Sequence, residues 1–378
     1  MRVAQVSCFV DPLDREPGAL LEEWPTLRLV AAAAARAGAD VTVIQAAGRD
    51  FETERDGVAF AFVRETAPSA VRRRLGPWSW RPPGRLAQRV AAARPDVLHV
   101  HGLAFARQAG RLAHPLPGIP LLAQDHADHP PQRWKRGWLR AGFRRMTGIA
   151  FTAEEQAAPF RDAGLLRPPT RVFTVPESSS TFVPGDAAAA RAATGIDGDP
   201  CLLWLGRLDG NKDPLTVLEA LALTADSLPR ARLWCCYGAA PQLDTVRARV
   251  EGDPALRGRV QLLGEQPHAR VQILLRAADF LVQASRSEGS GFAVLEAMAC
   301  GTTPLVTNIP AFRALTDGGT FGALATPGDA HGMARAWIDW AARPRARLRS
   351  DVRAHFEREL SYDAIGRRLL SIYQALLP

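Results

Sequence analysis

Short apolar runs rich in β-branched residues alternate along the chain with longer stretches in which apolar residues recur at helical spacing. The runs predict strands over residues 3–9, 41–45, 58–63, 97–101, 121–124, 149–152, 172–175, 201–205, 233–237, 260–263, 280–283 and 303–306. The stretches between them predict helices, among them residues 20–37, 84–93, 104–112, 132–145, 153–163, 333–342 and 364–376. Apolar strands separated by helices are typical of parallel sheets covered on both faces. The pattern therefore predicts an α/β fold with doubly wound parallel sheets.

One segment interrupts this alternation. Residues 176–200, PESSSTFVPGDAAAARAATGIDGDP, are rich in Ser, Gly, Pro and Asp, as linkers are, and the alternation restarts after them. A chain of 378 residues is long enough for two domains. We therefore expect one domain over residues 1–180, a second over 198–360, and a closing helical segment over 361–378. Ligands of such domains bind at the carboxyl ends of the strands.

Composition narrows the class of protein. A hydrophobic fraction of 47% with 23% charged residues excludes a mainly disordered chain. The net charge of +8 suits an anionic partner such as a nucleotide phosphate or an anionic lipid, and no nucleic-acid recognition motif accompanies it. Of the 47 basic side chains only Lys135 and Lys212 are lysines, so each lysine merits inspection.

The cysteines and the apolar segments bear on location. The five cysteines include no C-x-x-C pair and lie mostly in apolar runs, which indicates reduced core thiols in a reducing compartment. The first residues lack the long apolar region of a secretory signal, and no apolar stretch approaches the ~18 residues that span a bilayer. We therefore expect a cytoplasmic protein.

A glycine-rich turn follows the strand that ends near residue 284. The sequence SRSEGSGFAVLEAMACG places Gly289 and Gly291 before a helix, where exposed amides and the helix dipole favour an anion. Glu296 is the one acid on that otherwise apolar helix, so we expect it to be buried and to meet donors such as sugar hydroxyls. A hydrogen bond to the protein's own backbone is the alternative for Glu296, and a solvated turn is the alternative for Glu288.

Two cations follow the strand at 201–205. Arg207 and Lys212 lie in CLLWLGRLDGNKDP, on a loop before the helix that Asp213 and Pro214 begin. At the carboxyl end of a strand they would neutralise a diphosphate leaving group in place of a divalent metal ion. The alternative is a pair of solvated loop charges.

These two segments resemble a known family. GRLDGNKDP and SEGSGFAVLEAMACGTTPLV are similar to the retaining glycosyltransferase family 4, which has the E-x7-E signature and the GT-B fold of two Rossmann-like domains. Further resemblance lies in PDVLHVHG, LLAQDHADHP, VFTVPESSSTFVPGD, RVQLLGEQPHARVQILLRAADFLVQAS and LSYDAIGRRLLSIYQALL, the last of these matching a final helix that crosses back to the first domain. The resemblance covers most of the chain from Pro95 onward.

The resemblance implies a retaining, metal-independent transfer from a UDP- or GDP-sugar, with no cofactor, in the biosynthesis of polysaccharides or related glycans. The acceptor would be a glycan, a lipid-linked saccharide or a small molecule. It implies the following donor-binding residues: Arg207, Lys212, Gly289, Gly291 and Phe292 for the diphosphate, Glu296 for the ribose, Glu288 for the sugar and Gln266 for the base. His126 would lie beside the donor sugar. His126, Glu288, Arg207 and Lys212 would be the catalytic residues.

The chain departs from the family pattern at three places. The loop after the first strand carries Gly18 alone where a glycine pair is usual, and Ser290 replaces an aromatic residue between the two motif glycines. The segment NIPAFRAL replaces a glycine pair and an acid. The first two departures affect the acceptor geometry and the identity of the donor sugar, and the third leaves the phosphate site unchanged.

Four histidines of the first domain require a separate assessment. His99, His101, His126 and His129 lie near Asp125 and Asp128, which raises the alternative of a metal site. We expect His99 and His101 to point to alternate faces of their strand, and QDHADH is not a helix-spaced zinc signature, so we predict no metal. A plain structural role is the alternative for His126.

The stretch RWKRGWLRAGFRRM, residues 133–146, combines arginines with Trp134 and Trp138. One interpretation is contact with an anionic membrane surface, to which VRRRLGPWSWRPP at 71–83 would add. The other is a solvated helix face with some Trp packed inward.

A nucleotide-sugar epimerase or a silent nucleotide-sugar-binding protein of the same fold is the alternative to transfer. An NAD enzyme is disfavoured because no G-x-G-x-x-G follows the first strand.

Overall fold

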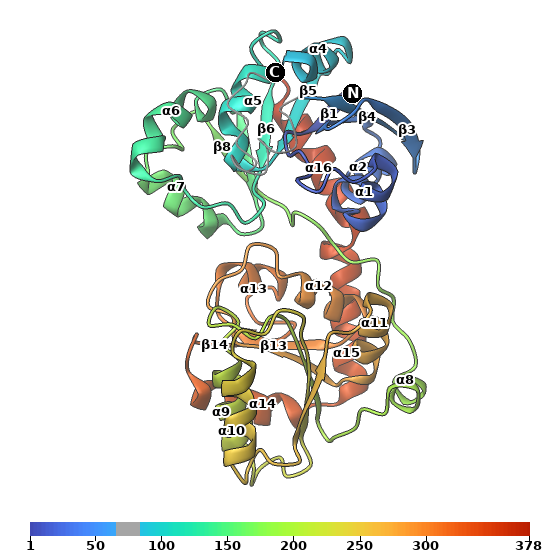
Figure 1. The fold of residues 1–378 in the computed structure, drawn as a ribbon, viewed down its shortest axis with the longest axis vertical. Helices are drawn as coiled ribbons and strands as arrows, with labels where there is room; N and C mark the ends of the chain where they lie inside the picture. The colour runs from blue at the N-terminus through green and yellow to red at the C-terminus, as the bar shows by residue number, and fades with distance from the viewer. Residues whose placement is uncertain (66–83) are drawn as a thin grey trace. The chain divides into compact units, whose positions relative to one another are not determined.

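The computed structural model describes residues 1–65 and 84–378 (Figure 1). The chain forms two compact units, which we call unit 1 (Met1–Ser178 with Tyr362–Pro378) and unit 2 (Ser179–Ser361). The basic stretch at 71–83 lies outside the described residues.

Unit 1 is built on an eight-stranded sheet. Its strands are, in order across the sheet, β3 (Phe51–Arg55), β4 (Val58–Arg64), β2 (Asp40–Ala47), β1 (Arg2–Ser7), β5 (Val97–His101), β6 (Leu121–Gln124), β7 (Gly148–Phe151) and β8 (Arg171–Thr174). All neighbours are parallel except the hairpin of β3 and β4. The sequence pattern missed β3 because FETER is polar and, as an edge strand, remains largely exposed.

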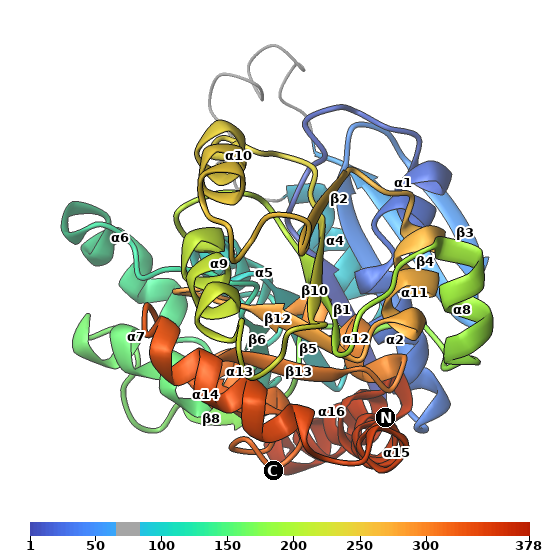
Figure 2. The same ribbon diagram turned by 90° about the horizontal axis from the view of Figure 1, so that it is seen from below.

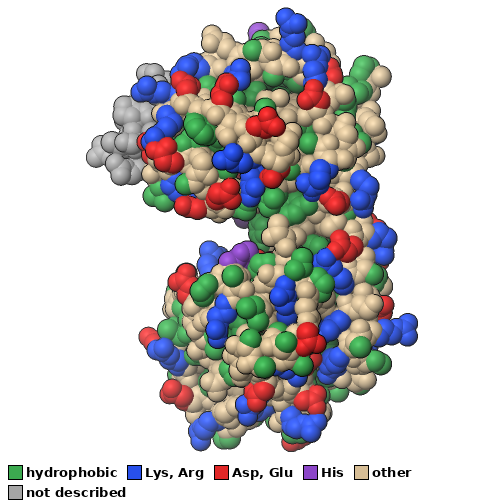
Figure 3. All heavy atoms as spheres, turned by 90° about the vertical axis from the view of Figure 1, so that its right-hand side faces the viewer, with side chains coloured by type: hydrophobic (Ala, Val, Ile, Leu, Met, Phe, Trp, Pro, Cys, Tyr) green, Lys and Arg blue, Asp and Glu red, His purple; other side chains and the backbone are tan. Residues whose placement is uncertain are grey.

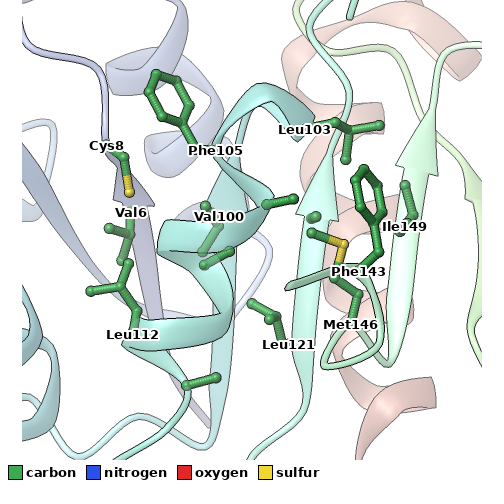
Figure 4. Packing of buried hydrophobic residues seen from close by; sticks show 14 of the residues in the cluster. Val6, Cys8, Val100, Leu103, Phe105, Leu112, Leu121, Phe143, Met146 and Ile149 are labelled. Atoms are coloured by element: carbon green, nitrogen blue, oxygen red, sulfur yellow. The ribbon is translucent and has the colours of Figure 1, made fainter. Parts of the chain in front are cut away.

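Helices cover both faces of this sheet. On one face lie α4 (Gly84–Ala92), α5 (Ala106–Leu112), α6 (Arg133–Phe143) and α7 (Ala158–Asp162), with short 3₁₀ turns at Leu103–Phe105 and Glu154–Ala157. Figure 4 shows part of this core, in which Leu112 and Phe143 reach the residues of the strands. On the other face lie α1 (Pro17–Glu23), α2 (Thr26–Arg36) and α16 (Tyr362–Leu376). The single helix predicted at 20–37 was wrong, because Pro25 interrupts it.

The last helix of the chain belongs to unit 1. α16 packs on the alanine-rich α2 so closely that a Cβ at Gly366 would lie 2.1 Å from the carbonyl oxygen of Ala33. Tyr373 on α16 is fully buried, and its hydroxyl lies 2.8 Å from His99 Nδ1. The final segment therefore completes one face of the first sheet.

Unit 2 contains a six-stranded, all-parallel sheet. Its order is β11 (Val260–Gly264), β10 (Arg232–Cys236), β9 (Cys201–Leu205), β12 (Phe280–Gln283), β13 (Thr303–Thr307) and β14 (Ala323–Ala325). One face carries α9 (Pro214–Leu223), α10 (Leu243–Gly252) and α14 (Ala330–Ala341). The other carries α8 (Ala187–Thr194), α11 (His268–Ala277), α12 (Phe292–Ala299), α13 (Pro310–Leu315) and α15 (Arg345–His355), and a π-helical turn at Phe356–Leu360 follows. The doubly wound parallel α/β prediction is confirmed.

The predicted linker at 176–200 contains a helix. α8 begins after Asp186, whose side chain accepts a hydrogen bond from the amide of Ala189, and it ends at Gly195 in the left-handed conformation. It packs against α11, as Figures 1 and 2 show. Asp186 and Gly195 of this segment are thus helix caps as much as linker residues.

All five cysteines are buried and free, so each acts as a small apolar side chain. Burial raises the pKa of the Cys201 thiol to about 12.

Within the described ranges, no helix has both the length and the apolar character needed to cross a membrane. On the face in Figure 3, cationic and acidic side chains are interspersed.

Candidate active site

A pocket of about 450 Å³ opens at the carboxyl end of the sheet in unit 2. The ends of β9, β10 and β12 and the start of α12 form it, as expected for a doubly wound sheet. Seven predicted residues line it together: Arg207, Lys212, Gln266, Glu288, Gly291, Phe292 and Glu296. Gly289 lies in the same turn, between Glu288 and the buried Ser290.

The start of α12 is fixed by a glycine. Gly291 has φ +68°, and a Cβ there would lie 2.9 Å from Leu315 Cδ1 and 3.1 Å from Phe312 Cε1. Only glycine fits both the backbone angle and this contact. The first amides of a helix have no acceptor within the helix, so α12 presents donors and the positive end of its dipole to the pocket.

The two predicted cations have different surroundings. Lys212 is largely buried, and its ammonium is ion-paired with Glu288, whose side chain is only 14% exposed. Arg207 is 61% exposed, and its Nε lies 2.9 Å from Asp209 Oδ2. Asp209 also accepts the amide hydrogen of Lys212 at 2.9 Å. The loop is therefore ordered around Asp209, and Glu288 is not the solvated turn residue of the alternative interpretation.

Glu296 is only partly buried, with 20% of its side chain exposed. Its Oε1 lies 2.7 Å from Nε2 of His268, the first residue of α11, so a side chain of the protein, and not its backbone, is its partner. Burial raises the pKa of Glu296, and the hydrogen bond and charge of His268 oppose that rise. Sequence reasoning did not assign His268, and its place in the EQPHAR segment, two residues after Gln266, was the one available signal.

Gln266 contributes to the pocket through a side chain that is already bonded. Its Nε2 donates to the carbonyl oxygen of Leu263 at 2.8 Å. This bond closes the loop between β11 and α11 and orients the wall of the pocket that Gln266 forms.

His126 lies in unit 1, in the loop after β6, and is not one of the residues that line the pocket of unit 2. Its Nε2 lies 3.0 Å from Nδ1 of His101, and its Nδ1 lies 3.1 Å from Oε2 of Glu177. The contact with Glu177 is an ion pair when His126 is protonated. Burial lowers the pKa of His126, but the contact with Glu177 and the charges of Asp128 and Asp125 reverse this effect and raise it.

The neighbouring histidines are neutral. Burial lowers the pKa of His99 to about 3 and places that of His101 well below its usual range. The prediction that they point to alternate faces was wrong: their ring centroids are 4.4 Å apart, since residues two apart on a strand share a face. Within 1–65 and 84–378, no group of three or more His, Cys, Asp or Glu is arranged to hold a metal ion.

Two family models match the chain. Residues 186–355 match "Glycosyl transferases group 1", and residues 26–177 match "Glycosyltransferase Family 4". Together they cover most of both units.

Curated relatives are similar over part of their length. A D-inositol 3-phosphate glycosyltransferase of Geodermatophilus obscurus is 31% identical over 67% of this chain and 59% of its own. A GDP-mannose:cellobiosyl-diphosphopolyprenol alpha-mannosyltransferase of Xanthomonas campestris is 29% identical over 59% of each chain. The chain thus spans about three fifths of the length of these relatives.

Solved structures share the fold. Sucrose-phosphate synthase of Thermosynechococcus elongatus matches with a TM-score of 0.67 at 21% identity, covering 100% of this chain and 99% of that one. HepE of Anabaena in complex with UDP and glucose matches with a TM-score of 0.65 at 17% identity, covering 100% of both chains.

Proposed function

Since the chain belongs to the glycosyl transferases group 1 family, and its first unit matches glycosyltransferase family 4, we propose that it transfers a sugar from a nucleotide-diphosphate donor to an acceptor. One observation carries the proposal: the pocket of unit 2 brings together two cations, a glycine-started helix and the carboxylates of Glu265, Glu288 and Glu296. These groups match the charges and hydroxyls of a UDP- or GDP-sugar.

Each pocket residue has a distinct task in this proposal. Lys212 and Arg207 neutralise the diphosphate as it leaves, together with the amides at the start of α12, and so act in place of a metal ion. The ammonium of Lys212 has three N–H groups and therefore binds a phosphate oxygen while it remains paired with Glu288. Glu296 retains Oε2 for the ribose hydroxyls, since Oε1 faces His268.

Transfer in this proposal retains the anomeric configuration. The acceptor hydroxyl attacks from the face that the phosphate leaves, and a phosphate oxygen takes the acceptor proton. Glu288, held by Lys212, contacts the donor sugar. The acceptor is a glycan, a lipid-linked saccharide or a small molecule; one relative is named for a diphosphopolyprenol and another for inositol 3-phosphate.

We also propose that the protein is cytoplasmic and that α6 contacts an anionic membrane. Trp134 is 73% exposed on α6, and the five arginines of 133–145 form no ion pair with any residue in the described ranges. Exposed Trp beside unpaired cations suits a headgroup layer. The test is sedimentation with vesicles: binding to anionic vesicles that exceeds binding to zwitterionic ones, and that Trp134→Ala weakens, supports the contact. Equal binding to both vesicle types contradicts it.

The activity is tested with a panel of nucleotide sugars, with and without acceptors, in the presence of EDTA. We expect one donor to raise the unfolding midpoint, and its nucleotide to be released only when an acceptor is present. NMR of the product then gives the anomeric configuration. Conversion of the sugar without an acceptor indicates an epimerase, and binding without turnover indicates a silent binding protein. Either result overturns the proposal, and loss of activity in EDTA overturns metal independence.

A further inference from the structure

Both ring nitrogens of His126 face groups of the protein. Glu177, which follows β8 and is 8% exposed at its side chain, lies 3.1 Å from Nδ1. His101, at the end of β5, lies 3.0 Å from Nε2. Three segments distant in the sequence thus meet at one imidazole, all within unit 1. A histidine that accepts a proton during a reaction needs a free nitrogen lone pair, and this arrangement leaves neither nitrogen open.

The partners indicate where the protons are. A carboxylate accepts only, so the nitrogen facing Glu177 carries a proton. His101 is buried, lies against the rings of His99 and His126 and stays neutral, so its Nδ1 is able to accept a hydrogen bond from Nε2 of His126. The other acids that act on His126 are Asp125 and Asp128, both on its own loop. Asp128 is already bonded to the amides of Leu103 and Ala104.

We propose that Glu177 is a positioning residue that holds His126 as an imidazolium, with Nδ1–H directed at Glu177 and Nε2–H donated to His101. His126 then acts as a fixed positive charge at the carboxyl edge of the first sheet, and it does not serve as a general base. A fixed charge of this kind favours negative charge that develops on an oxygen close to it. The link to catalysis rests on the proposed function, whereas the state of the imidazole does not.

NMR of the whole chain with ¹⁵N-labelled histidine tests the imidazole directly. We expect both nitrogens of His126, assigned by loss of its signals in His126→Gln, to carry protons at a pH where free histidine has lost one. Glu177→Gln should move the titration midpoint of His126 to lower pH, because the neutral amide no longer stabilises the cation. Glu177→Asp, which keeps the charge, should retain more of the raised midpoint.

The matched control is Glu154→Gln, which removes a carboxylate that is 71% exposed in the same unit. It should leave the His126 midpoint unchanged. If Glu177→Gln does not fold, the wild-type titration still decides, because a midpoint at or below that of free histidine overturns the proposal. A midpoint that Glu177→Gln leaves unchanged overturns it too.

The pH dependence of kcat tests the consequence. Because the charged form is the active one, activity should fall as the pH rises through the His126 midpoint, and Glu177→Gln should bring that fall to lower pH. At a pH between the midpoints of the variant and the wild type, the loss should be roughly ten- to a hundredfold, with little change in KM. If the NMR result holds while no donor is turned over, the proposed function fails and the positioning role stands. If turnover occurs but the profile does not move, the proposed role of the charge in catalysis is wrong.

Discussion

The Nε2 atom of His268 lies 2.7 Å from Oε1 of Glu296, and this contact joins the first residue of α11 to the middle of α12. It holds one oxygen of a partly buried carboxylate and leaves the other for a ligand. His268 also packs on Phe182, with ring centroids 4.6 Å apart, so its imidazole is itself held in place. The acid of the E-x7-E signature is therefore oriented before any nucleotide binds.

Glu296→Ala should weaken nucleotide binding by roughly ten- to a hundredfold, the effect of losing hydrogen bonds to a charged acceptor worth about 1.5–3 kcal/mol. Because burial raises the pKa of Glu296, its carboxylate takes up a proton at a higher pH than the carboxylate of an exposed glutamate. As the pH falls, nucleotide binding to the wild type should therefore begin to weaken at that higher pH. Calorimetric titration with UDP and GDP measures both effects. Glu251→Ala, at an exposed position on α10, is the matched control. Affinity that Glu296→Ala leaves unchanged would contradict the ribose assignment.

Lys212→Ala should reduce kcat by about a hundredfold or more and change KM less, because its charge matters most when the diphosphate leaves. The substitution also leaves Glu288 without its ion-pair partner. Steady-state kinetics with the active donor provide the measurement, and Arg230→Ala, at a position 79% exposed in the same unit, is the control. An effect confined to KM would show that Lys212 only binds substrate.

Gly291→Ala should destabilise the protein and weaken nucleotide binding, because the new Cβ meets Leu315 and Phe312 at a positive φ. Gly318→Ala separates the two causes, since Gly318 has φ +64° and nothing within 4 Å of its Cβ position. Both variants should lose about 1 kcal/mol through the backbone angle, and Gly291→Ala should lose a further ~1–3 kcal/mol through overpacking. Urea denaturation and UDP titration test this. Equal losses of stability would exclude the packing argument.

Asp125→Asn should stabilise the protein at alkaline pH. Burial and the charge of Asp128 raise the pKa of Asp125 from 3.8 to about 7, so between these values the folded state binds more protons than the unfolded state. The free energy of unfolding therefore falls as the pH rises through this window, and an amide removes that loss. At pH 8 the gain should be roughly 1–3 kcal/mol, and near pH 4 it should vanish. Urea denaturation at both pH values measures it.

The control for this pair of measurements is Asp162→Asn, which removes one exposed charge from the same unit. It should show no such dependence on pH. A gain at pH 8 that equals the gain at pH 4 would mean that Asp125 is not protonated in the folded state at neutral pH.

Local patterns in the sequence predicted the strands well. The runs at 97–101, 121–124, 201–205 and 280–283 match β5, β6, β9 and β12 at both ends, since a strand buried on both faces must be apolar throughout. The polar β3 and the three-residue β14 carry no such signal. The breaks inside the predicted helices, such as the one at Pro25, depend on single residues that a periodic pattern passes over.

The pocket of unit 2 was predictable because its residues follow strand ends, and parallel strands bring their carboxyl ends to one edge. Arg207, Lys212, Glu288, Gly291 and Glu296 meet there for that reason.

The sequence by itself determined the class of fold, the edges where the charged loops gather and the spacing of residues within each motif, because these depend on neighbours in the chain. Only the tertiary structure decided which group pairs with which: Glu288 with Lys212, Glu296 with His268, and His126 with Glu177 and His101. Such pairs join loops from different strands, and their distances and burial are set by packing over the whole unit. Burial and pairing in turn decide the charge on each side chain, which no local pattern contains.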